Sequence, residues 1–276
     1  MNIEKKLLSK VIPLWIVAAL STGCAASRLV PEPEVATADA LTQIDSAAGC
    51  ALETMRIMSK IDYVDGVNNK RVVGQDLVFS AQPPLNMRIT ISAFDKAVST
   101  LVSDGVGFAL IDVGQNVFVT GHATPENISQ ILPVYLSAAD LFRVIYGDFP
   151  KDSLAEDAAE RQTFAWDARE GGYARTLALS DGRSMKVIHE WPSGAVKKIT
   201  VLDGEKEAYK YEASSFETVT TEAGQSCLYP REILFSLPEQ KTDVRLRVEK
   251  RDMDVEFSPA VFRLIPPEGS QIILME

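Results

Sequence analysis

Residues 83–120 read PPLNMRITISAFDKAVSTLVSDGVGFALIDVGQNVFVT, and the spacing of their apolar side chains decides the fold class. Met87, Ile89 and Ile91 alternate with polar residues, which is the period-two pattern of a strand with one buried face. Asp104-Gly105 separates two further apolar runs, as a tight turn between antiparallel strands does. The stretch therefore predicts consecutive hairpins of an antiparallel sheet.

Comparable alternating or apolar runs continue towards both ends of the chain, and turn residues separate many of them. These runs lie at 70–80, 97–102, 106–112, 116–121, 173–179, 184–190, 196–202, 207–213, 227–236, 243–249 and 253–257. These runs predict about ten or eleven antiparallel strands. Strand twist should roll a sheet of that size into a half-open barrel.

Two segments have helical spacing instead. Residues 38–61 carry apolar side chains at intervals of three and four, beginning with Leu41 and Ile44, which predicts one N-terminal helix. Residues 125–146 predict a short central helical insertion, divided at Pro133 because proline ends or kinks a helix. The expected class is α+β, with both helical segments covering the concave face of the half-barrel.

The composition limits the classes of partner. The chain has 276 residues, with 28 basic and 38 acidic side chains and a net charge of −10. An acidic chain of this length can bury a sizeable core, but it lacks the basic face that nucleic acid requires. We therefore expect no nucleic-acid partner.

The N-terminus resembles a secretion signal followed by a bacterial lipobox. Lys5, Lys6 and Lys10 precede an apolar run at 11–20 that is too short to span a bilayer, and small residues lead to Cys24. This resemblance implies cleavage after residue 23 and diacylation of Cys24, although Ser21 stands where the lipobox usually has leucine. An ordinary cleaved signal with a chance cysteine is the alternative.

Three parts of the chain follow from this interpretation. Residues 1–23 are the signal peptide, residues 24–37 are the lipidated cysteine and a flexible tether, and residues 38–276 are one domain. Ala25, rather than aspartate, follows the cysteine and favours outer-membrane sorting with the domain facing the periplasm. The acyl chains would then attach the protein to the membrane.

The remaining cysteines are Cys50 and Cys227. An even pair in an oxidising compartment can form a disulfide, whereas the alternative is two buried thiols that pack as small apolar side chains. Both interpretations stay open at this stage.

Few side chains suggest chemistry. The chain contains two histidines, His122 and His189, and we expect both to be exposed at strand ends. No spacing of Cys and His matches a metal site, and no glycine-rich loop matches a phosphate site. The sequence therefore predicts a non-enzymatic protein with no cofactor and no metal.

Four short motifs, in this order, resemble the LolA/LolB-like lipoprotein-carrier superfamily. Residues 83–88 resemble its proline-containing turn, residues 101–105 its Ser-Asp-Gly hairpin, residues 229–233 a late strand opening, and residues 262–269 its closing Phe-x-Leu-x-Pro-Pro-x-Gly strand. Gln82 departs from the basic residue that soluble members often place before the turn. The sequence also shows no clear exposed apolar loop of the kind that the lipid-anchored receptor uses for insertion.

This resemblance implies a periplasmic protein with an apolar cavity for the acyl chains of a lipoprotein or lipid, with transfer to the outer membrane and an envelope protein as a further partner. Its mouth would lie between the 38–61 helix, the 125–146 insertion and the 83–88 turn. The alternative is a dry, close-packed core in an envelope scaffold or binding lipoprotein. The residues expected to line the cavity are Met87, Ile89, Ile91, Phe108, Leu110, Val117, Val119, Leu177, Leu179 and Phe235.

Overall fold

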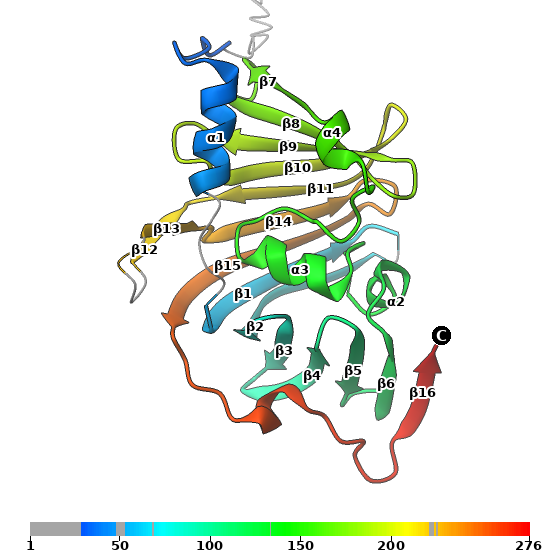
Figure 1. Ribbon diagram of the computed structural model, residues 1–276. Coiled ribbons are helices and arrows are strands. Elements are labelled where there is room, and N and C mark those ends of the chain that lie inside the picture. Colours follow the sequence, from blue (N-terminus) through cyan, green and yellow to red (C-terminus); the bar gives the residue numbers. More distant parts are fainter. Residues whose placement is uncertain (1–28, 48–52, 68, 133, 221–223, 225) are drawn as a thin grey trace, which may run out of the picture.

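One strongly curved sheet forms the body of the protein (Figure 1). A computed structural model describes residues 29–47, 53–67, 69–132, 134–220, 224 and 226–276. The described strands form a fourteen-stranded sheet in the order β16-β6-β5-β4-β3-β2-β1-β15-β14-β11-β10-β9-β8-β7, and a separate two-stranded sheet, β12-β13. Neighbours are antiparallel except that β16 runs parallel to β6. The curled sheet stays unclosed, in agreement with the predicted half-barrel.

The elements have the following bounds. The strands are β1 (Met55–Asp65), β2 (Lys70–Gln82), β3 (Asn86–Ala93), β4 (Lys96–Ser103), β5 (Gly107–Asp112), β6 (Val117–His122), β7 (Thr163–Asp167), β8 (Gly172–Ala178), β9 (Ser184–Glu190), β10 (Val196–Asp203), β11 (Lys206–Ser214), β12 (Glu217–Thr220), β13 (Ser226–Tyr229), β14 (Glu232–Leu237), β15 (Thr242–Met253) and β16 (Gln271–Met275). The helices are α1 (Thr37–Ala47), α2 (Pro125–Ser129), α3 (Ala138–Ile145), α4 (Ala158–Arg161) and the 3-10 helix η1 (Pro259–Phe262).

The hairpins predicted for residues 83–120 are confirmed. Strands β3, β4, β5 and β6 follow one another as antiparallel neighbours. The β4–β5 turn is fixed by Asp104, whose Oδ1 accepts the backbone N–H groups of Val106 at 3.0 Å and Gly107 at 2.8 Å. An aspartate that bonds the backbone ahead of it is a local turn signal, which is why this part of the sheet could be predicted.

The predicted strand number was wrong. The described residues form sixteen strands instead of ten or eleven. The run at 227–236 is two strands, because Pro230 lacks the N–H that a continuous ladder needs. Residues 163–167 and 217–220 also form short strands that the sequence analysis did not predict.

The single helix expected at 38–61 was also wrong. Helix α1 ends at Ala47, and Met55 begins β1, the strand that pairs with both β2 and β15 in the middle of the sheet. Helix α1 packs Ala40 and Ile44 against Tyr173 of β8 at the far end of the sheet, and these residues form a small second core. This helix therefore does not cover the main core.

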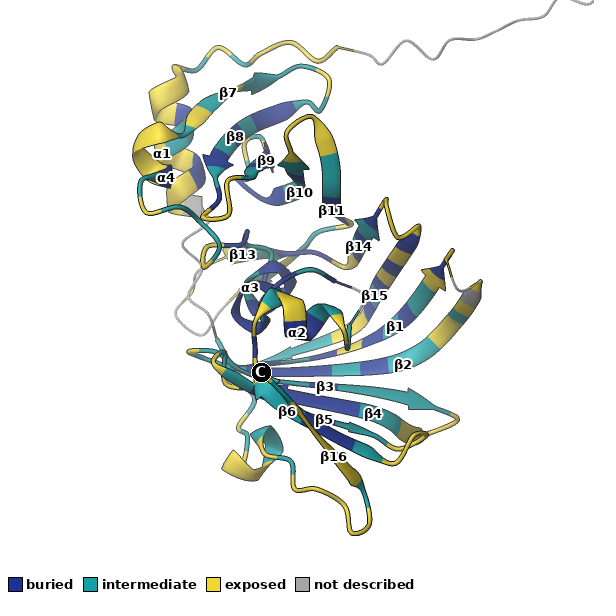
Figure 2. Ribbon diagram, turned by 90° about the vertical axis from the view of Figure 1, so that its right-hand side faces the viewer, coloured by how far each residue is buried: buried dark blue, intermediate teal, exposed yellow. Residues whose placement is uncertain are grey.

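Short helices lie on the concave side of the sheet, as Figure 2 shows. Helix α2 begins with Pro125 after Thr124, whose side chain accepts the N–H of Asn127, and α3 follows in the same insertion. Helix α4 lies against β8 farther along the sheet. The central insertion therefore brings α3 over the middle strands.

The expected closing strand at 262–269 was wrong as well. After β15 the chain crosses the convex face as an irregular strap with η1 next to β3, where Arg88 donates to the carbonyl of Val261 at 2.9 Å. Pro266 and Pro267 lack N–H donors, so this segment cannot pair along a strand. The closing strand is β16, which begins two residues after Gly269 and runs parallel to β6.

Candidate functional site

An apolar cavity lies between the concave face of the sheet and α3. Its volume is about 60 Å³, and its walls come from β1, β2, β3, β14 and β15, from α3, and from the segment before α3. Ser59 is the one polar residue among the described lining residues, and its hydroxyl donates to the carbonyl of Leu77 at 3.2 Å. The lining residues are Ile57, Ser59, Ile61, Leu77, Phe79, Ile89, Ile91, Leu132, Val134, Leu141, Ile145, Ile233, Phe235, Val244, Leu246 and Val248.

The structure brings three of the ten predicted lining residues to this cavity: Ile89, Ile91 and Phe235. The other seven pack in the same main core without reaching the cavity wall. All seven are buried except Val117, which is partly buried. They are Met87, Phe108, Leu110, Val117, Val119, Leu177 and Leu179.

The sequence analysis missed the wall that β1 contributes. Ile57, Ser59 and Ile61 alternate along this strand and face the cavity. Their period-two spacing was present in the sequence, but it overlapped the helical spacing read at 38–61. On β15, Val244, Leu246 and Val248 form a further part of the wall; they lie in the run expected at 243–249, but the sequence analysis did not assign them to the cavity.

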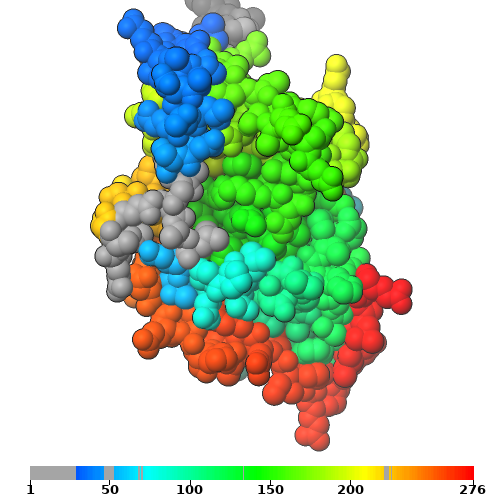
Figure 3. Space-filling model, viewed as in Figure 1, coloured from blue at the N-terminus to red at the C-terminus, as the bar shows by residue number. Residues whose placement is uncertain are grey.

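Helix α3 covers the cavity and is almost fully buried itself. Its N-cap Ser137 accepts the N–H of Asp140 at 3.0 Å, and Leu141 and Ile145 point into the cavity from the buried face. Figure 3 shows the insertion, in green, packed across the concave side between α1 and the strands in cyan. Helix α3 therefore closes the cavity on the side opposite the sheet, as its lid.

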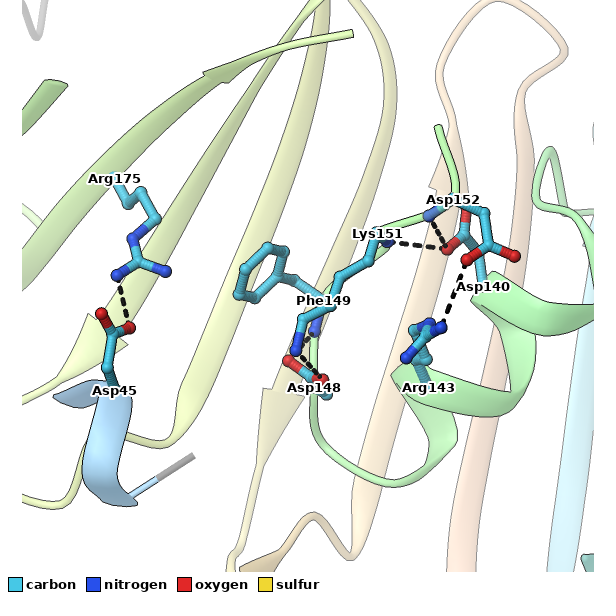
Figure 4. A network of polar contacts seen from close by, with 8 residues as sticks. All are labelled: Asp45, Asp140, Arg143, Asp148, Phe149, Lys151, Asp152 and Arg175. Carbon is cyan, nitrogen blue, oxygen red and sulfur yellow. Dashed lines mark hydrogen bonds and ion pairs between the residues drawn. The ribbon is translucent and has the colours of Figure 1, made fainter. Parts of the chain in front are cut away.

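A polar network fixes the outer side of α3 to the segment that follows it (Figure 4). Asp140 is 2% exposed, and its Oδ1 accepts the backbone N–H groups of Lys151 at 2.8 Å and Asp152 at 3.1 Å. Arg143 also pairs with Asp152 at 3.2 Å. Burial raises the pKa of the Asp140 carboxyl, whereas the two backbone donors lower it. The network therefore positions α3 from outside the cavity.

Two tyrosines tie the C-terminal end of α3 to its surroundings. The hydroxyl of Tyr146 donates to the carbonyl of Glu53, and Tyr211 donates to the carbonyl of Val144 at 3.3 Å. The Tyr146 ring stacks on Phe142 with centroids 4.6 Å apart. The two tyrosine contacts are uncharged, so the charged contacts of α3 described here lie on its outer side, at Asp140 and Arg143.

Cys227 lies fully buried in β13, within the main core, and is disulfide-bonded. Its predicted partner, Cys50, lies outside the described residues, as does Cys24. The Cys50–Cys227 pairing and the lipidation of Cys24 therefore stay predictions.

The expectation that both histidines are exposed was wrong for His189. Its side chain is fully buried, and Nδ1 contacts the carbonyl of Gly194 at 3.1 Å in the β9–β10 turn. Burial lowers the pKa of His189 to about 4, and nearby Arg175 acts in the same direction. His122 is exposed, as expected.

This burial predicts a loss of stability in acid. The unfolded chain binds a proton at His189 near pH 6.5, whereas the folded chain binds it only near pH 4. The free energy of unfolding should therefore fall as the pH drops through this window, by up to about 3 kcal/mol. Urea denaturation at several pH values measures it. His189→Gln should flatten the fall relative to the matched variant His122→Gln, and equal curves for both variants would contradict the assignment.

A bulky apolar residue stands alone at the tip of the β3–β4 hairpin. Phe94 is 98% exposed and has φ +51°, with Asp95 at φ +59°, so the two form a tight turn in the left-handed region. Positive φ is unfavourable for a large side chain, so the backbone at Phe94 is strained. The structure therefore exposes one large apolar side chain on a hairpin turn that the sequence analysis did not single out.

Two further properties concern only the described residues. Among them no three side chains of His, Cys, Asp or Glu gather closely enough to hold a metal ion. None of their helices combines the length and apolarity needed to cross a bilayer.

Comparisons with known proteins bear on the fold. No family model and no curated protein matches the chain. Several solved structures, however, resemble it in fold. A LolA superfamily protein from Nitrosomonas europaea aligns at TM-score 0.54 and 9% identity over 83% of this chain and 99% of its own. A domain described as an outer membrane lipoprotein-sorting protein, from Vibrio parahaemolyticus, aligns at TM-score 0.57 and 8% identity over 81% and 94%.

A DUF1329 family protein from Desulfovibrio piger aligns at TM-score 0.55 and 10% identity, over 82% of this chain and 95% of its own. Each alignment spans 94–99% of the known structure and 81–83% of this chain, so the likeness extends over most of both chains. At these identities the likeness is one of fold. The chain has a LolA-like fold.

Proposed function

We propose that this chain is a non-enzymatic, periplasmic carrier that holds acyl chains of lipids or lipoproteins between its curved sheet and α3. The observation that carries the proposal is the apolar cavity under α3, in a fold shared with a lipoprotein-sorting domain. An apolar wall binds acyl chains by contact area, at about 25 cal/mol per Å² buried, and so would discriminate little between chain types.

Cargo would require the lid to move. A cavity of about 60 Å³ is far smaller than the ~300–1,000 Å³ of ordinary ligand pockets. Displacement of α3 would widen the space, because Leu141 and Ile145 form part of the cavity wall. The structure described above would then be the closed, unloaded state.

The small volume also favours a second candidate function, an envelope scaffold or binding lipoprotein with a filled barrel. Titration with the apolar dye bis-ANS separates the two functions. A carrier should bind the dye with a rise in fluorescence that oleate reverses. A scaffold with a dry core should leave the dye dark with or without oleate, and that result would remove the carrier proposal.

The tip at Phe94 is our candidate for membrane contact during release. Inserting a phenylalanine side chain into a bilayer gains about 1.5–3 kcal/mol. Phe94→Asp should therefore slow transfer of a fluorescent lipid from protein to vesicles by about tenfold, without loss of stability, because aspartate tolerates positive φ. The matched variant is Val106→Asp, an equally drastic change at an exposed turn at the other end of β4. Equal transfer rates for the two variants would exclude this role for Phe94.

The anchor forms a separate part of the proposal. A diacylated Cys24 would hold the domain at the outer membrane through the tether at 24–37, facing the periplasm. Globomycin, which inhibits the lipoprotein signal peptidase, should block processing of the precursor in cells. Unchanged processing would contradict lipidation and leave the carrier proposal standing.

A further inference from the structure

The curved sheet ends in a strand with one free edge. Strands β7 and β16 are the outermost strands of the fourteen-stranded sheet. Strand β16 pairs with β6 on one side, and no described strand pairs with its other side. Figure 1 shows this strand, in red, at the opposite end of the sheet from β7.

Strand β16 exposes apolar side chains on both of its faces. Residues 271–275 read QIILM, without a charge or a proline. Ile272 and Leu274 are 57% and 75% exposed, and Ile273, which points to the other face, is 38% exposed. Proteins usually protect a free strand edge with charged side chains, proline or a bulge. Strand β16 has none of these, because its pairing with β6 is also regular.

The other end of the sheet is protected. Strand β7 includes the charged residue Asp167, and α1 lies against it. The segment before α1 also binds there, because Val30 donates its N–H to the carbonyl of Ala168 at 2.8 Å. Its own carbonyl accepts the indole N–H of Trp166 at 3.0 Å. Of the two ends of the described sheet, only the one at β16 is left apolar and open.

Strand β16 is held closely against β6 at its C-terminal end. The side-chain amide of Asn127 donates to the carbonyl of Glu276 at 3.2 Å. Gly121 of β6 has no Cβ, and a Cβ at this position would collide with the carbonyl oxygen of Met275. The free edge is therefore already formed in the single chain.

The hydrogen bonds to β6 determine which backbone groups of β16 face outwards. The N–H of Gln271 donates to the carbonyl of Asn116, on the β6 side, at 3.0 Å. Because the backbone groups of successive residues in a strand point to opposite sides, those of Ile273 also face β6. The N–H and C=O groups of Ile272 and Leu274 therefore face the free edge.

We infer that a second copy of this chain adds its own β16 antiparallel to this edge, about a twofold axis that passes beside Ile273. This inference goes beyond the proposed function and does not depend on it.

One register uses all of the outward backbone groups. With Ile273 opposite the same residue of the second copy, Ile272 of each copy lies opposite Leu274 of the other. These two pairs form four hydrogen bonds, two in each pair. The exposed Ile272 and Leu274 side chains of both copies then gather on one face of the joined sheets, and their removal from water favours pairing.

The charges of the chain agree with this register. The net charge is −10, so two copies repel each other and should meet where charges are few. In the twofold register Glu276 lies opposite Ser270, and Glu268 has no residue opposite it. No two carboxylates therefore face each other across the joined strands.

The small size of the strand predicts a reversible dimer. Strand β16 has five residues, and one such strand covers less than the ~800 Å² that each partner buries in a stable complex. We therefore expect a dissociation constant on the order of 10 μM, with monomer and dimer in exchange.

Disulfide cross-linking in cells that produce the full chain tests the pairing. Ile273→Cys places two thiols opposite each other at a non-hydrogen-bonded pair, where they are close enough to bond. The matched control is Val73→Cys, which also replaces an exposed aliphatic side chain but lies on β2, inside the sheet. Ile273→Cys should give at least tenfold more covalent dimer than Val73→Cys, over the background that the wild-type cysteines give.

Two further variants test the register. Leu274→Cys alone should give little dimer, because position 274 of one copy lies opposite position 272 of the other. Its co-expression with Ile272→Cys, on chains with tags of different size, should restore a dimer that contains both tags. This exposed pair also decides the matter if Ile273→Cys does not accumulate.

Three results would overturn the inference. The first is a dimer yield for Ile273→Cys, and for the co-expressed pair, no higher than for Val73→Cys. The second is a Leu274→Cys variant that cross-links alone as well as the co-expressed pair does, which would exclude the antiparallel register. The third is a cross-linked product that contains another protein in place of a second copy.

Discussion

Ser59→Leu should reduce acyl-chain binding at least tenfold while the protein stays folded. Ser59 is 2% exposed and is the one polar group among the described cavity-lining residues. Leucine places an isobutyl group where the cavity of about 60 Å³ lies, so the start of the space for a chain is filled. Overfilling a core costs about 1–3 kcal/mol, whereas replacing a buried hydroxyl by hydrocarbon offsets part of that cost.

The matched control is Met58→Leu. Met58 precedes Ser59 on β1 but points to the opposite, partly exposed face. Titration with a fluorescent fatty acid gives the dissociation constants, and thermal unfolding reports stability. If the leucine variant is too unstable, Ser59→Val fills less volume and suits a strand. A folded Ser59→Leu protein that binds with the affinity of Met58→Leu would show that the acyl chain lies elsewhere.

Loss of the disulfide should produce the largest change in stability. Cys227 is fully buried in β13 and disulfide-bonded, and a bond to Cys50 would join positions that are 177 residues apart. Closing so long a loop restricts the unfolded chain strongly, so removal should lower the free energy of unfolding by about 2–5 kcal/mol. Cys227→Ala should therefore unfold at markedly lower urea concentration.

The partner of Cys227 follows from comparing single and double variants. Cys50→Ala should lower stability about as much as Cys227→Ala, and the double variant should fall little further. Wild type with reducing agent should match Cys50→Ala. If Cys50→Ala keeps wild-type stability and Cys24→Ala loses it, the bond involves Cys24, and both the predicted pairing and lipidation of Cys24 are wrong.

Local signals in the sequence predicted the sheet where the turns lie close to the strands they join. Strands β3 to β6 pair in sequence order, and Asp104 makes its own turn. The curvature of the sheet was also predicted, because a large antiparallel sheet twists, although the expected number of strands was too low. The parallel pairing of β16 with β6 could not be predicted in this way, because the strap that joins β15 to β16 has no periodic pattern.

The prediction for the residues of β1 was wrong for a different reason. Met55, Met58 and Ile61 are spaced by three, and this spacing continued the helical pattern of α1. The same stretch alternates at Met55, Ile57 and Ile61. It becomes a strand because β15, whose paired residues lie 177 to 198 positions later in the chain, pairs with it. Pairing with a distant strand decided between the two local patterns. Because the sequence analysis chose the helical pattern, it did not predict the part of the cavity wall that β1 forms.

The same limit applies to the β1–β15 register and to the tip at Phe94. Asp65 and Thr242 become neighbours only through the β1–β15 register, which no local pattern encodes. Phe94 lacks the Asn-Gly or Asp-Gly signature of its tight turn, so its exposure could not be read from the sequence. The three lining residues that were predicted, Ile89, Ile91 and Phe235, lie on strands whose alternation is clear.

Native mass spectrometry of the protein purified from the periplasm without detergent tests the central claim most directly. The carrier proposal predicts adducts with the masses of fatty acids, phospholipid or lipopeptide, present on the wild type and lost from Ser59→Leu. A clean mass for the unliganded wild type, unchanged after incubation with the same lipids, would contradict the carrier proposal and favour the scaffold.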